Sequence, residues 1–453
     1  MLEYTGFGMS SFDAIEKKMQ GVGLSHAAVE AFRHCVDVLQ SNQSMMIPEA
    51  DIAPACDVAE WDSLVDATAE ADADLLAQTV VVKLNGGLGT SMGLQKAKSL
   101  LEIKPGVTFL DLIVRQVQSL RKRAGYPVNL LLMNSFSTSG DTMAYLSRYA
   151  AEGFADSDAV EMIQNRVPKL CRDTLQPVEF PENPELEWCP PGHGDIYPAL
   201  LGSGWLDKLL QAGVKYAFVS NADNLGAQLD TRFLRWFAES GSPFVMEVTR
   251  RTEADKKGGH LAVRRADGQP LLREVAQCPA EDVPEFQNIE KHRYFNTNNL
   301  WIRLDALQEL LQNNAGVVPL PVIRNEKTVD PRDASSAKVY QLEIAMGAAL
   351  QCFPGARAVC VPRSRFFPVK TCSDLLLLRS DAVEVDETGA MRLAPECGGV
   401  APVIQLDASV YKLVDSLDAL GVPSLKHVTR LEVHGAHRFA PGEALSGVVK
   451  VGV

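Results

Sequence analysis

The first segment of the chain whose residues could take part in ligand binding or catalysis is a glycine-rich turn followed by two lysines. From Leu84 to Gly93 it has the sequence LNGGLGTSMG, and Lys96 and Lys98 follow a short distance further along the chain. Glycines let a backbone approach a ligand closely, and the N–H groups of such a turn can hold phosphates. No Gly-Lys-Ser/Thr closes the turn, so it is not a Walker loop, and its glycine spacing does not suit a dinucleotide. The lysines favour a nucleotide phosphate site over a purely structural turn.

A histidine between two glycines is the second candidate. The segment from Cys189 to Tyr197 has the sequence CPPGHGDIY. The small neighbours of His193 offer little to bury its ring, which could therefore donate a hydrogen bond to a phosphate or sugar oxygen. The alternative is a structural histidine.

An acidic residue beyond a strand is the third. The segment SNADNLGA contains Asn221 and Asp223 after an apolar run. Open α/β sheets bind ligands at the carboxyl ends of their strands, where one carboxylate can hold Mg²⁺ with phosphate oxygens and water. A turn or a helix cap is the alternative, since Asn and Asp favour both.

The fourth candidate is a basic segment in an acidic chain. Arg363, Arg365 and Lys370 lie within eight residues, although the net charge is −13. A solvated basic loop is the alternative to a phosphate site. Two weaker signals are the loop KKGGH at 256–260 and the amide-rich segment FNTNNL at 295–300, whose amides could bond sugar hydroxyls.

Strands and helices that alternate along the chain are expected to position these residues. Short apolar runs predict six strands, and apolar periodicity predicts helices between several of them. The predicted strands are 80–84, 128–133, 216–220, 244–248, 300–303 and 358–361, and the helices include 110–124, 142–152 and 204–212. This alternation favours a mostly parallel sheet flanked by helices.

The length of 453 residues suggests more than one domain. We divide the chain into an N-terminal helical region at 1–76, a catalytic α/β domain at 77–385 and a C-terminal domain at 386–453. From Leu425 onward, apolar residues recur at short intervals among glycines. This spacing favours a parallel β-helix fragment over an ordinary antiparallel sheet.

Composition limits the partners and the compartment. An acidic surface repels phosphate-rich polymers and anionic lipids, so we expect no nucleic-acid and no membrane partner. The nine cysteines form no CxxC pair, and the N-terminus has no basic start followed by an apolar run. Reduced thiols and a cytoplasmic location are therefore expected. Whether the protein is a monomer or a homo-oligomer is not determined by the sequence.

Taken together, the motifs resemble the eukaryotic-type UTP–glucose-1-phosphate uridylyltransferases, also called UDP-glucose pyrophosphorylases. The resemblance covers residues 80–380, in family order. Its segments are LNGGLGTSMG with KAKSL, NSFST, CPPGHGDIY, SNADNLGA, KKGGHL, FNTNNLW, YQLEIAMGAA and VPRSRFFPVKTCSDLL. It implies a central nucleotide-binding domain of glycosyltransferase-A-like (Rossmann-like) type and a C-terminal left-handed parallel β-helix.

The resemblance also implies roles for individual residues. Lys98 and Lys370 match the lysines on the UTP phosphates and would be catalytic, and Asp223 matches the Mg²⁺ ligand. The other nucleotide-binding residues would be Leu84, Asn85, Gly86, Gly87, Gln164, Gly192 and Asn221. The residues for the sugar phosphate would be His193, Gly259, Asn296 and Asn298.

The implied reaction joins UTP and glucose 1-phosphate to give UDP-glucose and pyrophosphate. A phosphate oxygen of the sugar phosphate attacks the α-phosphorus of UTP in line with the leaving pyrophosphate. Because this nucleophile is already an anion, no protein nucleophile or general base is needed. The alternatives are the same chemistry with galactose 1-phosphate or N-acetylglucosamine 1-phosphate, a non-catalytic nucleotide-binding regulator, and a nicotinamide dehydrogenase.

Overall fold

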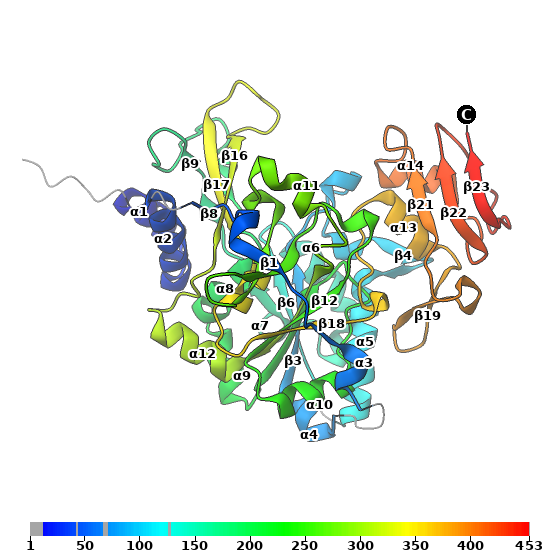
Figure 1. The fold of residues 1–453 in the computed structure, drawn as a ribbon, viewed down its shortest axis with the longest axis horizontal. Coiled ribbons are helices and arrows are strands. Elements are labelled where there is room, and N and C mark those ends of the chain that lie inside the picture. Colours follow the sequence, from blue (N-terminus) through cyan, green and yellow to red (C-terminus); the bar gives the residue numbers. More distant parts are fainter. Residues whose placement is uncertain (1–11, 42–43, 67–70, 126–127, 453) are drawn as a thin grey trace, which may run out of the picture. The chain divides into compact units, whose positions relative to one another are not determined.

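The chain folds into two compact units whose segments interleave in sequence (Figure 1). The computed structural model describes residues 12–41, 44–66, 71–125 and 128–452. Unit 1 contains 1–59, 162–215 and 241–360, and unit 2 contains 60–161, 216–240 and 361–453. Each unit combines strands and helices, which confirms the mixed α/β class.

Three parallel strands form the centre of unit 2. β3 (Thr79–Asn85) pairs with β11 (Tyr216–Asn221) on one side and with β6 (Asn129–Asn134) on the other. Their apolar side chains are buried along almost their whole length, as expected for parallel strands covered on both faces. The carboxyl ends of the three strands therefore lie at one edge.

A buried lysine crosslinks the first two of these strands. Lys83 of β3 is 2% exposed, and its Nζ donates to Ser220 Oγ at 2.8 Å and to the carbonyl of Ala227 at 2.6 Å. A buried ammonium is costly unless its donors are satisfied. The loop after β11 is therefore held close to β3.

Helix α5 (Phe109–Ala124) begins at a capping box in unit 2. Thr108 Oγ1 accepts from the N–H of Asp111, and Asp111 Oδ2 accepts from the N–H of Thr108. The Asp111 carboxylate also accepts from the hydroxyls of Tyr145, at 2.7 Å, and Tyr149, at 2.6 Å. One buried carboxylate thus joins the start of α5 to the segment around α6 (Ser139–Leu146).

Short parallel strands follow in the C-terminal part of unit 2. β21 (Val403–Leu406), β22 (Val428–Val433) and β23 (Gly447–Val451) pair in that order, in parallel (Figure 1). Ile404, Leu431 and Val449 share one row of the sheet, and Leu431 is fully buried. The antiparallel alternative for this region is therefore wrong.

The other helices and strands of unit 2 complete it. They are α3 (Trp61–Leu64), α4 (Ala73–Ala77), β4 (Glu102–Lys104), β5 (Val107–Thr108), α7 (Ser157–Val160), α10 (Thr231–Ser240), α13 (Cys372–Arg379), β19 (Val383–Val385), β20 (Met391–Leu393) and α14 (Val414–Leu420).

A mixed group of strands forms the centre of unit 1. β12 (Phe244–Arg250) pairs in parallel with β18 (Arg357–Cys360) and antiparallel with β15 (Tyr294–Arg303). β13 (His260–Arg264) runs antiparallel to β15, to β14 (Pro270–Arg273) and to β1 (Ile52–Pro54). Most of the strand pairs in unit 1 are therefore antiparallel, whereas the sequence predicts a mostly parallel sheet.

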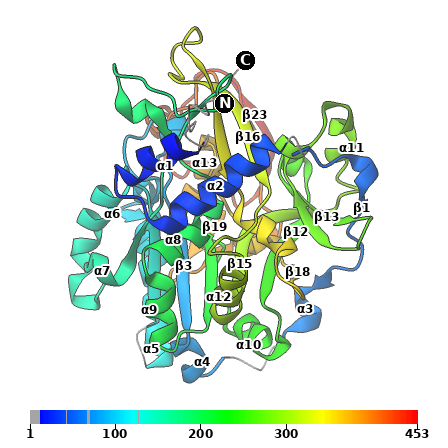
Figure 2. The same cartoon turned by 90° about the vertical axis from the view of Figure 1, so that its left-hand side faces the viewer.

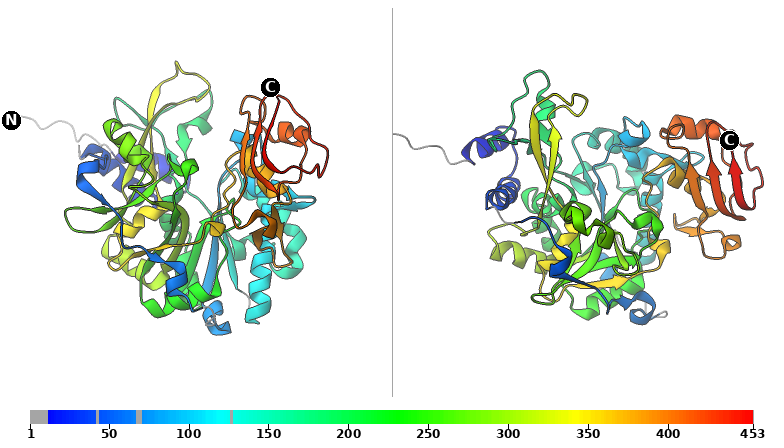
Figure 3. Two further views of the ribbon diagram at one scale, coloured as in Figure 1. Left: turned by 45° about the vertical axis from the view of Figure 1, so that its right-hand side comes forward. Right: turned by 45° about the horizontal axis from the view of Figure 1, so that its top comes forward.

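Helices and a long ribbon surround these strands in unit 1. Helix α2 (His26–Gln40) packs against α8 (Ile196–Gly202) (Figure 2). β16 (Val322–Thr328) and β17 (Lys338–Ile344) form a long antiparallel hairpin (Figure 3), and β17 also pairs with Leu170–Cys171. The remaining elements are α1 (Asp13–Gln20), β8 (Val167–Pro168), β9 (Leu170–Cys171), β10 (Trp188–Cys189), α9 (Trp205–Gln211), α11 (Val283–Phe286) and α12 (Leu304–Asn313). The strands β2 (Ala59–Glu60) and β7 (Glu161–Ile163) lie where the chain passes between the units.

The six predicted strands are confirmed as β3, β6, β11, β12, β15 and β18, although β15 already begins at Tyr294. The predicted helix 142–152 is α6 followed by a 3₁₀ segment, Ser147–Glu152. The N-terminal region is helical at α1 and α2, but residues 52–54 form β1 because they pair with β13. None of the helices in the described ranges is long and apolar enough to cross a membrane.

The Asp111 cluster generates a stability prediction. Burial alone would raise the pKa of Asp111, but the hydrogen bonds from Thr108, Tyr149 and Tyr145 outweigh burial and lower it. A lowered pKa stabilises the fold above the unfolded-state value and ceases to do so as the pH falls through the folded-state value. Asp111→Asn should therefore lower the free energy of unfolding at pH 7 by about 1–3 kcal/mol.

Urea unfolding at several pH values measures this effect. The difference between wild type and Asp111→Asn should be constant near neutral pH and shrink below about pH 4. Glu290→Gln, which changes an exposed carboxylate, is the control. Equal stability of Asp111→Asn and wild type at pH 7 would contradict the assignment.

Candidate active site

The glycine-rich turn and the Asn221 segment meet at the carboxyl ends of parallel strands in unit 2. Leu84 of β3 lies opposite Asn221 of β11, and the N–H of Ala222 donates to the Leu84 carbonyl at 3.0 Å. Asp223 follows directly. The predicted placement of these residues at the carboxyl ends of parallel strands is therefore confirmed, and this is the edge at which open α/β sheets bind ligands.

An ion pair joins the two segments. Lys98 Nζ lies 2.6 Å from Asp223 Oδ2, and the two side chains are 19% and 22% exposed. The N–H of Lys98 also donates to the Gly87 carbonyl at 3.1 Å, and a short bridge pairs Leu88 with Ala97. These contacts close the turn and place Lys98 beside the Asp223 carboxylate. A helix cap would not need such an ion pair, so the pair argues against the helix-cap alternative for Asp223.

The basic segment is fastened to the same loop by Asn224. The Asn224 side chain accepts from the N–H of Phe367 at 2.8 Å and donates to the carbonyl of Arg365 at 3.2 Å. The N–H of Val369 donates to the Asp223 carbonyl at 3.3 Å. Val369 is thus bonded to Asp223, and the exposed Lys370 is the residue that follows Val369 in the chain.

Only part of the predicted basic cluster is available to a ligand. Arg365 is 8% exposed, its guanidinium lies 4.9 Å from the ring centre of Trp61, and Nη2 donates to the Gln228 carbonyl. The expectation of three clustered cations is wrong at Arg365, because its guanidinium packs in the interior of unit 2.

Asn85 points into the protein. Its amide nitrogen donates to Asn134 Oδ1 at 2.7 Å and to Thr142 Oγ1 at 3.0 Å, and the residue is 3% exposed. Ser135 Oγ donates to the Gly86 carbonyl at 2.9 Å. The side chains of this region therefore fix the glycine turn, and its backbone is left to contact a ligand.

His193 belongs to unit 1 and is half-buried. Its Nδ1 accepts a hydrogen bond from the N–H of Met346 at 3.0 Å, and burial lowers its pKa to about 4. The expectation that nothing buries the ring is wrong, because the chain at 344–346 packs against it. With Nδ1 as acceptor, the neutral ring carries its proton on Nε2 and can donate from there.

Gly192 needs to be glycine for two reasons. Its φ is +82°, and an added Cβ would lie 2.5 Å from the carbonyl oxygen of Ile344. Gln164 Nε2 donates to the Gly192 carbonyl at 3.0 Å, and the next residue, Asn165, is bonded through its N–H to Asp195 at 2.7 Å. Gln164, Gly192 and His193 therefore form one group.

The residues predicted for the hexose form a second group in unit 1. The N–H of Asn296 donates to the Gly259 carbonyl at 3.1 Å, and Asn296 Nδ2 donates to Asn298 Oδ1 at 2.8 Å. Gly347 links the groups, since an added Cβ there would lie 3.0 Å from Asn296 Nδ2, and Met346 bonds His193.

Glu274 is a further residue of this group, and it lies outside the motifs identified in the sequence. An added Cβ at Gly259 would lie 2.6 Å from the Glu274 carboxylate, so only glycine lets that carboxylate approach the backbone. A carboxylate accepts hydrogen bonds from sugar hydroxyls. The signal in the sequence was an acidic residue directly after the strand β14.

The donors at the strand edge suit Mg²⁺ only together with a nucleotide. The part of the chain that the structure describes has no group of three or more His, Cys, Asp or Glu arranged to hold a metal. Mg²⁺ in nucleotide enzymes commonly uses one or two carboxylates together with substrate phosphates and water. Asp223, a single partly exposed carboxylate at a strand end, fits that mode and does not fit a metal held by protein alone.

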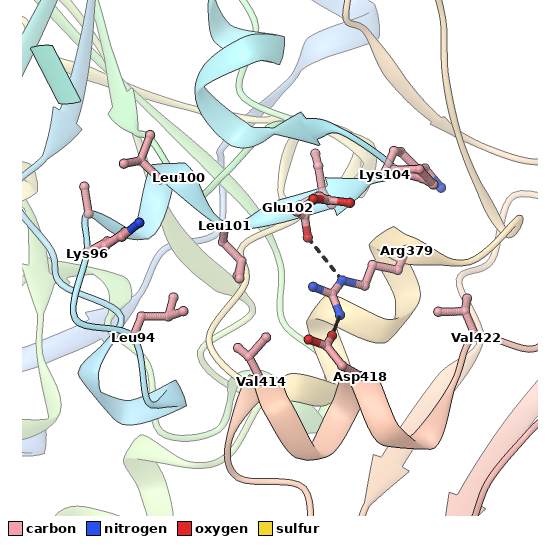
Figure 4. Close-up of a pocket in the computed structure, with 13 residues that line it drawn as sticks. Leu94, Lys96, Leu100, Leu101, Glu102, Lys104, Arg379, Val414, Asp418 and Val422 are labelled. Carbon is pink, nitrogen blue, oxygen red and sulfur yellow. Dashed lines mark hydrogen bonds and ion pairs between the residues drawn. The ribbon is translucent and has the colours of Figure 1, made fainter. Parts of the chain in front are cut away.

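A separate cavity of about 570 Å³ lies in unit 2 beside the turn (Figure 4). Lys96, Leu100 and Leu101 line it together with Val414 and Arg379, and Arg379 is paired with Asp418. The predicted site residues are not among its lining residues. Lys96 therefore lines this cavity, whereas Lys98 pairs with Asp223.

The chain is similar over most of its length to a known protein family and to named enzymes of that family. The family described as UTP–glucose-1-phosphate uridylyltransferase matches residues 29–445. The enzyme of that name from Saccharomyces cerevisiae is 45% identical over 83% of this chain and 74% of its own length, and the one from Solanum tuberosum is 42% identical over 83% and 77%.

Solved structures agree with these relatives. UDP-glucose pyrophosphorylase from Leishmania major is 48% identical, with a TM-score of 0.91, covering 98% of this chain and 95% of that one. A point mutant of that enzyme, in complex with UDP-glucose, has the same TM-score and identity and covers 98% and 94%. The Trypanosoma brucei protein is 46% identical with a TM-score of 0.89, covering 98% and 95%.

The environment of His193 predicts its titration. Because burial lowers the pKa to about 4, the ring should stay neutral at neutral pH and become charged only near that value. NMR of the imidazole signals against pH, with His193→Gln to assign the resonance, measures this directly. A midpoint near the ordinary value of about 6.5 would contradict it.

Proposed function

The chain belongs to the UTP–glucose-1-phosphate uridylyltransferase family, and we propose that it makes UDP-glucose and pyrophosphate from UTP and glucose 1-phosphate. The observation that carries this proposal is the Lys98–Asp223 ion pair at the ends of parallel strands, with Lys370 fastened beside it. Two cations and one carboxylate at such an edge suit a nucleoside triphosphate with its metal.

Unit 2 holds most of the residues that we assign to UTP. The backbone of the turn contacts the nucleoside, and Lys98 and Lys370 face the phosphates. The assigned residues of unit 2 are Leu84, Asn85, Gly86, Gly87, Lys98, Asn221, Asp223 and Lys370, and those of unit 1 are Gln164 and Gly192. Gln164 is held by its hydrogen bond to the Gly192 carbonyl, and we assign it to the uracil edge.

Unit 1 holds the residues that we assign to the sugar phosphate. His193 donates from Nε2 to an oxygen of the sugar phosphate as a neutral ring. Asn296 and Asn298, with Gly259 and Glu274 beside them, bond the hexose hydroxyls. This assignment is supported by the hydrogen bonds that tie these residues to one another.

The residues of the chain supply alignment and charge. The sugar phosphate attacks as an anion, so the protein need not remove a proton, and its main task is to offset repulsion between two polyanions. Lys98 and Lys370 neutralise phosphate charge as pyrophosphate departs. A lysine is suited to this role because its ammonium is a compact charge on a flexible stem with three rotatable donors, so that it can exchange partners.

Asp223 is the residue that we assign to Mg²⁺. When bound, the metal would neutralise phosphate charge and help orient the nucleotide. Lys98 forms an ion pair with the Asp223 carboxylate. A triphosphate would offer Lys98 another anionic partner, and the Asp223 carboxylate would then be able to hold the metal.

We extend the proposal to three further features. The nucleotide-binding fold is of glycosyltransferase-A-like type, and residues 386–453 form a left-handed parallel β-helix, supported by the parallel order of β21, β22 and β23. The protein works in the cytoplasm, a location supported by its nine free cysteines.

A substrate panel tests the proposed function. Pyrophosphate release should be fastest with UTP and glucose 1-phosphate. It should be slower with other nucleoside triphosphates and with galactose 1-phosphate or N-acetylglucosamine 1-phosphate. No release with any combination would indicate a non-catalytic nucleotide-binding protein.

Lys370→Ala tests the catalytic cation. Because this ammonium offsets charge in the transition state, we expect turnover to fall by about a hundredfold or more with an unchanged melting temperature. Lys412→Ala, which removes another exposed lysine of unit 2, is the matched control. Near-normal turnover of Lys370→Ala would remove this residue from the mechanism.

Metal removal tests Asp223. EDTA should abolish turnover, and added Mg²⁺ should restore it. Asp223→Asn should require more Mg²⁺ for half-maximal rate, because an amide is a weaker ligand for a hard cation. Turnover that is indifferent to EDTA would show that Asp223 has another role.

A further inference from the structure

Unit 1 contains a completely buried carboxylate on the strand that pairs with β15, which carries the asparagines assigned to the hexose. Glu247 of β12 is 0% exposed. Its Oε2 accepts from Asn299 Nδ2 at 2.9 Å, and its Oε1 accepts from Trp301 Nε1 at 2.8 Å. Burial of a carboxylate is costly, so its position demands an explanation beyond packing.

The neighbouring strand β15 bulges at this point. Glu247 lies opposite Asn299, but the next residue, Val248, lies opposite Asn296. Residues 297 and 298 are therefore extra on β15, and Asn298 has φ of +58°. Bulges of this kind re-aim side chains next to active sites, and asparagine is among the residues that tolerate a left-handed backbone.

Glu247 holds this bulge from both its main chain and its side chain. Its carbonyl accepts from Thr297 Oγ1 at 2.7 Å, and the same hydroxyl accepts from the N–H of Asn299. The carboxylate then holds the side chains of Asn299 and Trp301 on the strand beyond. Glu247 therefore fixes β15 on the carboxyl-terminal side of Asn298.

The bulge in turn sets how the two hexose asparagines point. Asn298 donates its N–H to Asn296 Oδ1 at 2.9 Å and accepts from Asn296 Nδ2 at 2.8 Å. Among the hydrogen bonds of the described residues, Asn298 Nδ2 donates none. Both of its N–H groups are thus left for hydroxyl oxygens.

The chemistry at position 247 calls for a carboxylate. Both oxygens accept from N–H donors on β15, and a carboxylate is an acceptor on both sides. A glutamine of the same shape would turn an NH₂ group toward the Trp301 indole N–H or the Asn299 amide. Either a donor would then face the donor-only Trp301 indole N–H in a buried place, or the Asn299 amide would have to turn over to offer its oxygen, and both changes disturb the contacts that Glu247 makes with β15.

We propose that Glu247 is a positioning residue for hexose recognition. It acts through the β15 bulge to aim Asn296 and Asn298 at the sugar hydroxyls, and it does not touch the substrate. This inference rests on the proposed function, because it assumes that those asparagines bind the hexose of glucose 1-phosphate and UDP-glucose.

Glu247→Gln is the test, read out as a ratio of affinities. The dissociation constants for UDP and UDP-glucose are measured on the same sample, so that an unfolded fraction cancels. We expect the preference for UDP-glucose over UDP to fall about tenfold, corresponding to the loss of buried hydrogen bonds, while UDP affinity stays unchanged. The KM for glucose 1-phosphate should rise by a similar factor, with little change in the KM for UTP.

Two further variants separate positioning from general damage. Trp301→Phe removes the indole donor, so Glu247→Gln combined with Trp301→Phe should recover part of the lost preference. Ile302→Val weakens the packing of the same strand away from the bulge and should leave the ratio unchanged.

Failure of the inference is distinct from failure of the proposed function. If the wild-type protein forms UDP-glucose and prefers it over UDP, an unchanged ratio in Glu247→Gln overturns the positioning role alone. A ratio that falls equally in Ile302→Val also overturns it. If the wild-type protein shows no such activity and no preference, the proposed function itself fails.

Discussion

Parallel pairing of β3 with both β11 and β6 is the constraint on which the nucleotide side of this protein depends. It brings three strand ends to one edge, where the turn after β3 and the loop after β11 leave together. Lys83 holds the second loop from inside, since its buried ammonium is satisfied by Ser220 and by the carbonyl of Ala227. The Lys98–Asp223 pair holds it from outside. Both side chains of this ion pair are partly exposed, so the pair is weak enough to exchange partners when another anion binds.

In unit 1, main-chain groups rather than an ion pair hold the assigned site residues together. The segment 344–347, at the end of β17, contacts Gly192 through the Ile344 carbonyl, bonds His193 through Met346, and reaches Asn296 through Gly347. Each contact is close because one partner is a glycine or a backbone group. The histidine assigned to the sugar phosphate and the asparagines assigned to the hexose are thus tied to one segment, which is consistent with catalysis that relies on alignment.

Charge is used locally in an acidic chain. With a net charge of −13, the protein attracts polyanions only where cations are held at a specific place. Lys98 and Lys370 are held in this way, by the hydrogen bonds of Gly87 and by those around Asn224. Arg365 is not held at a ligand site, because its guanidinium donates to the Gln228 carbonyl in the interior of unit 2. As a neutral ring, His193 is able to donate a hydrogen bond from Nε2 without adding a charge that would bind anions indiscriminately.

The sequence by itself determined the strands, the glycine turn and the order of the motifs. Runs such as Val80–Val82 are buried on both faces and can form little other than a parallel strand, and the ligand edge follows from strand direction. Only the tertiary structure decided which side chains face that edge. Asn85 and Arg365 turn inward, His193 loses its proton to burial, and Glu247 holds a bulge about fifty residues away along the chain. These outcomes depend on what packs against each group from distant segments, and a linear pattern carries no record of such neighbours because burial and hydrogen bonding are set by the whole fold.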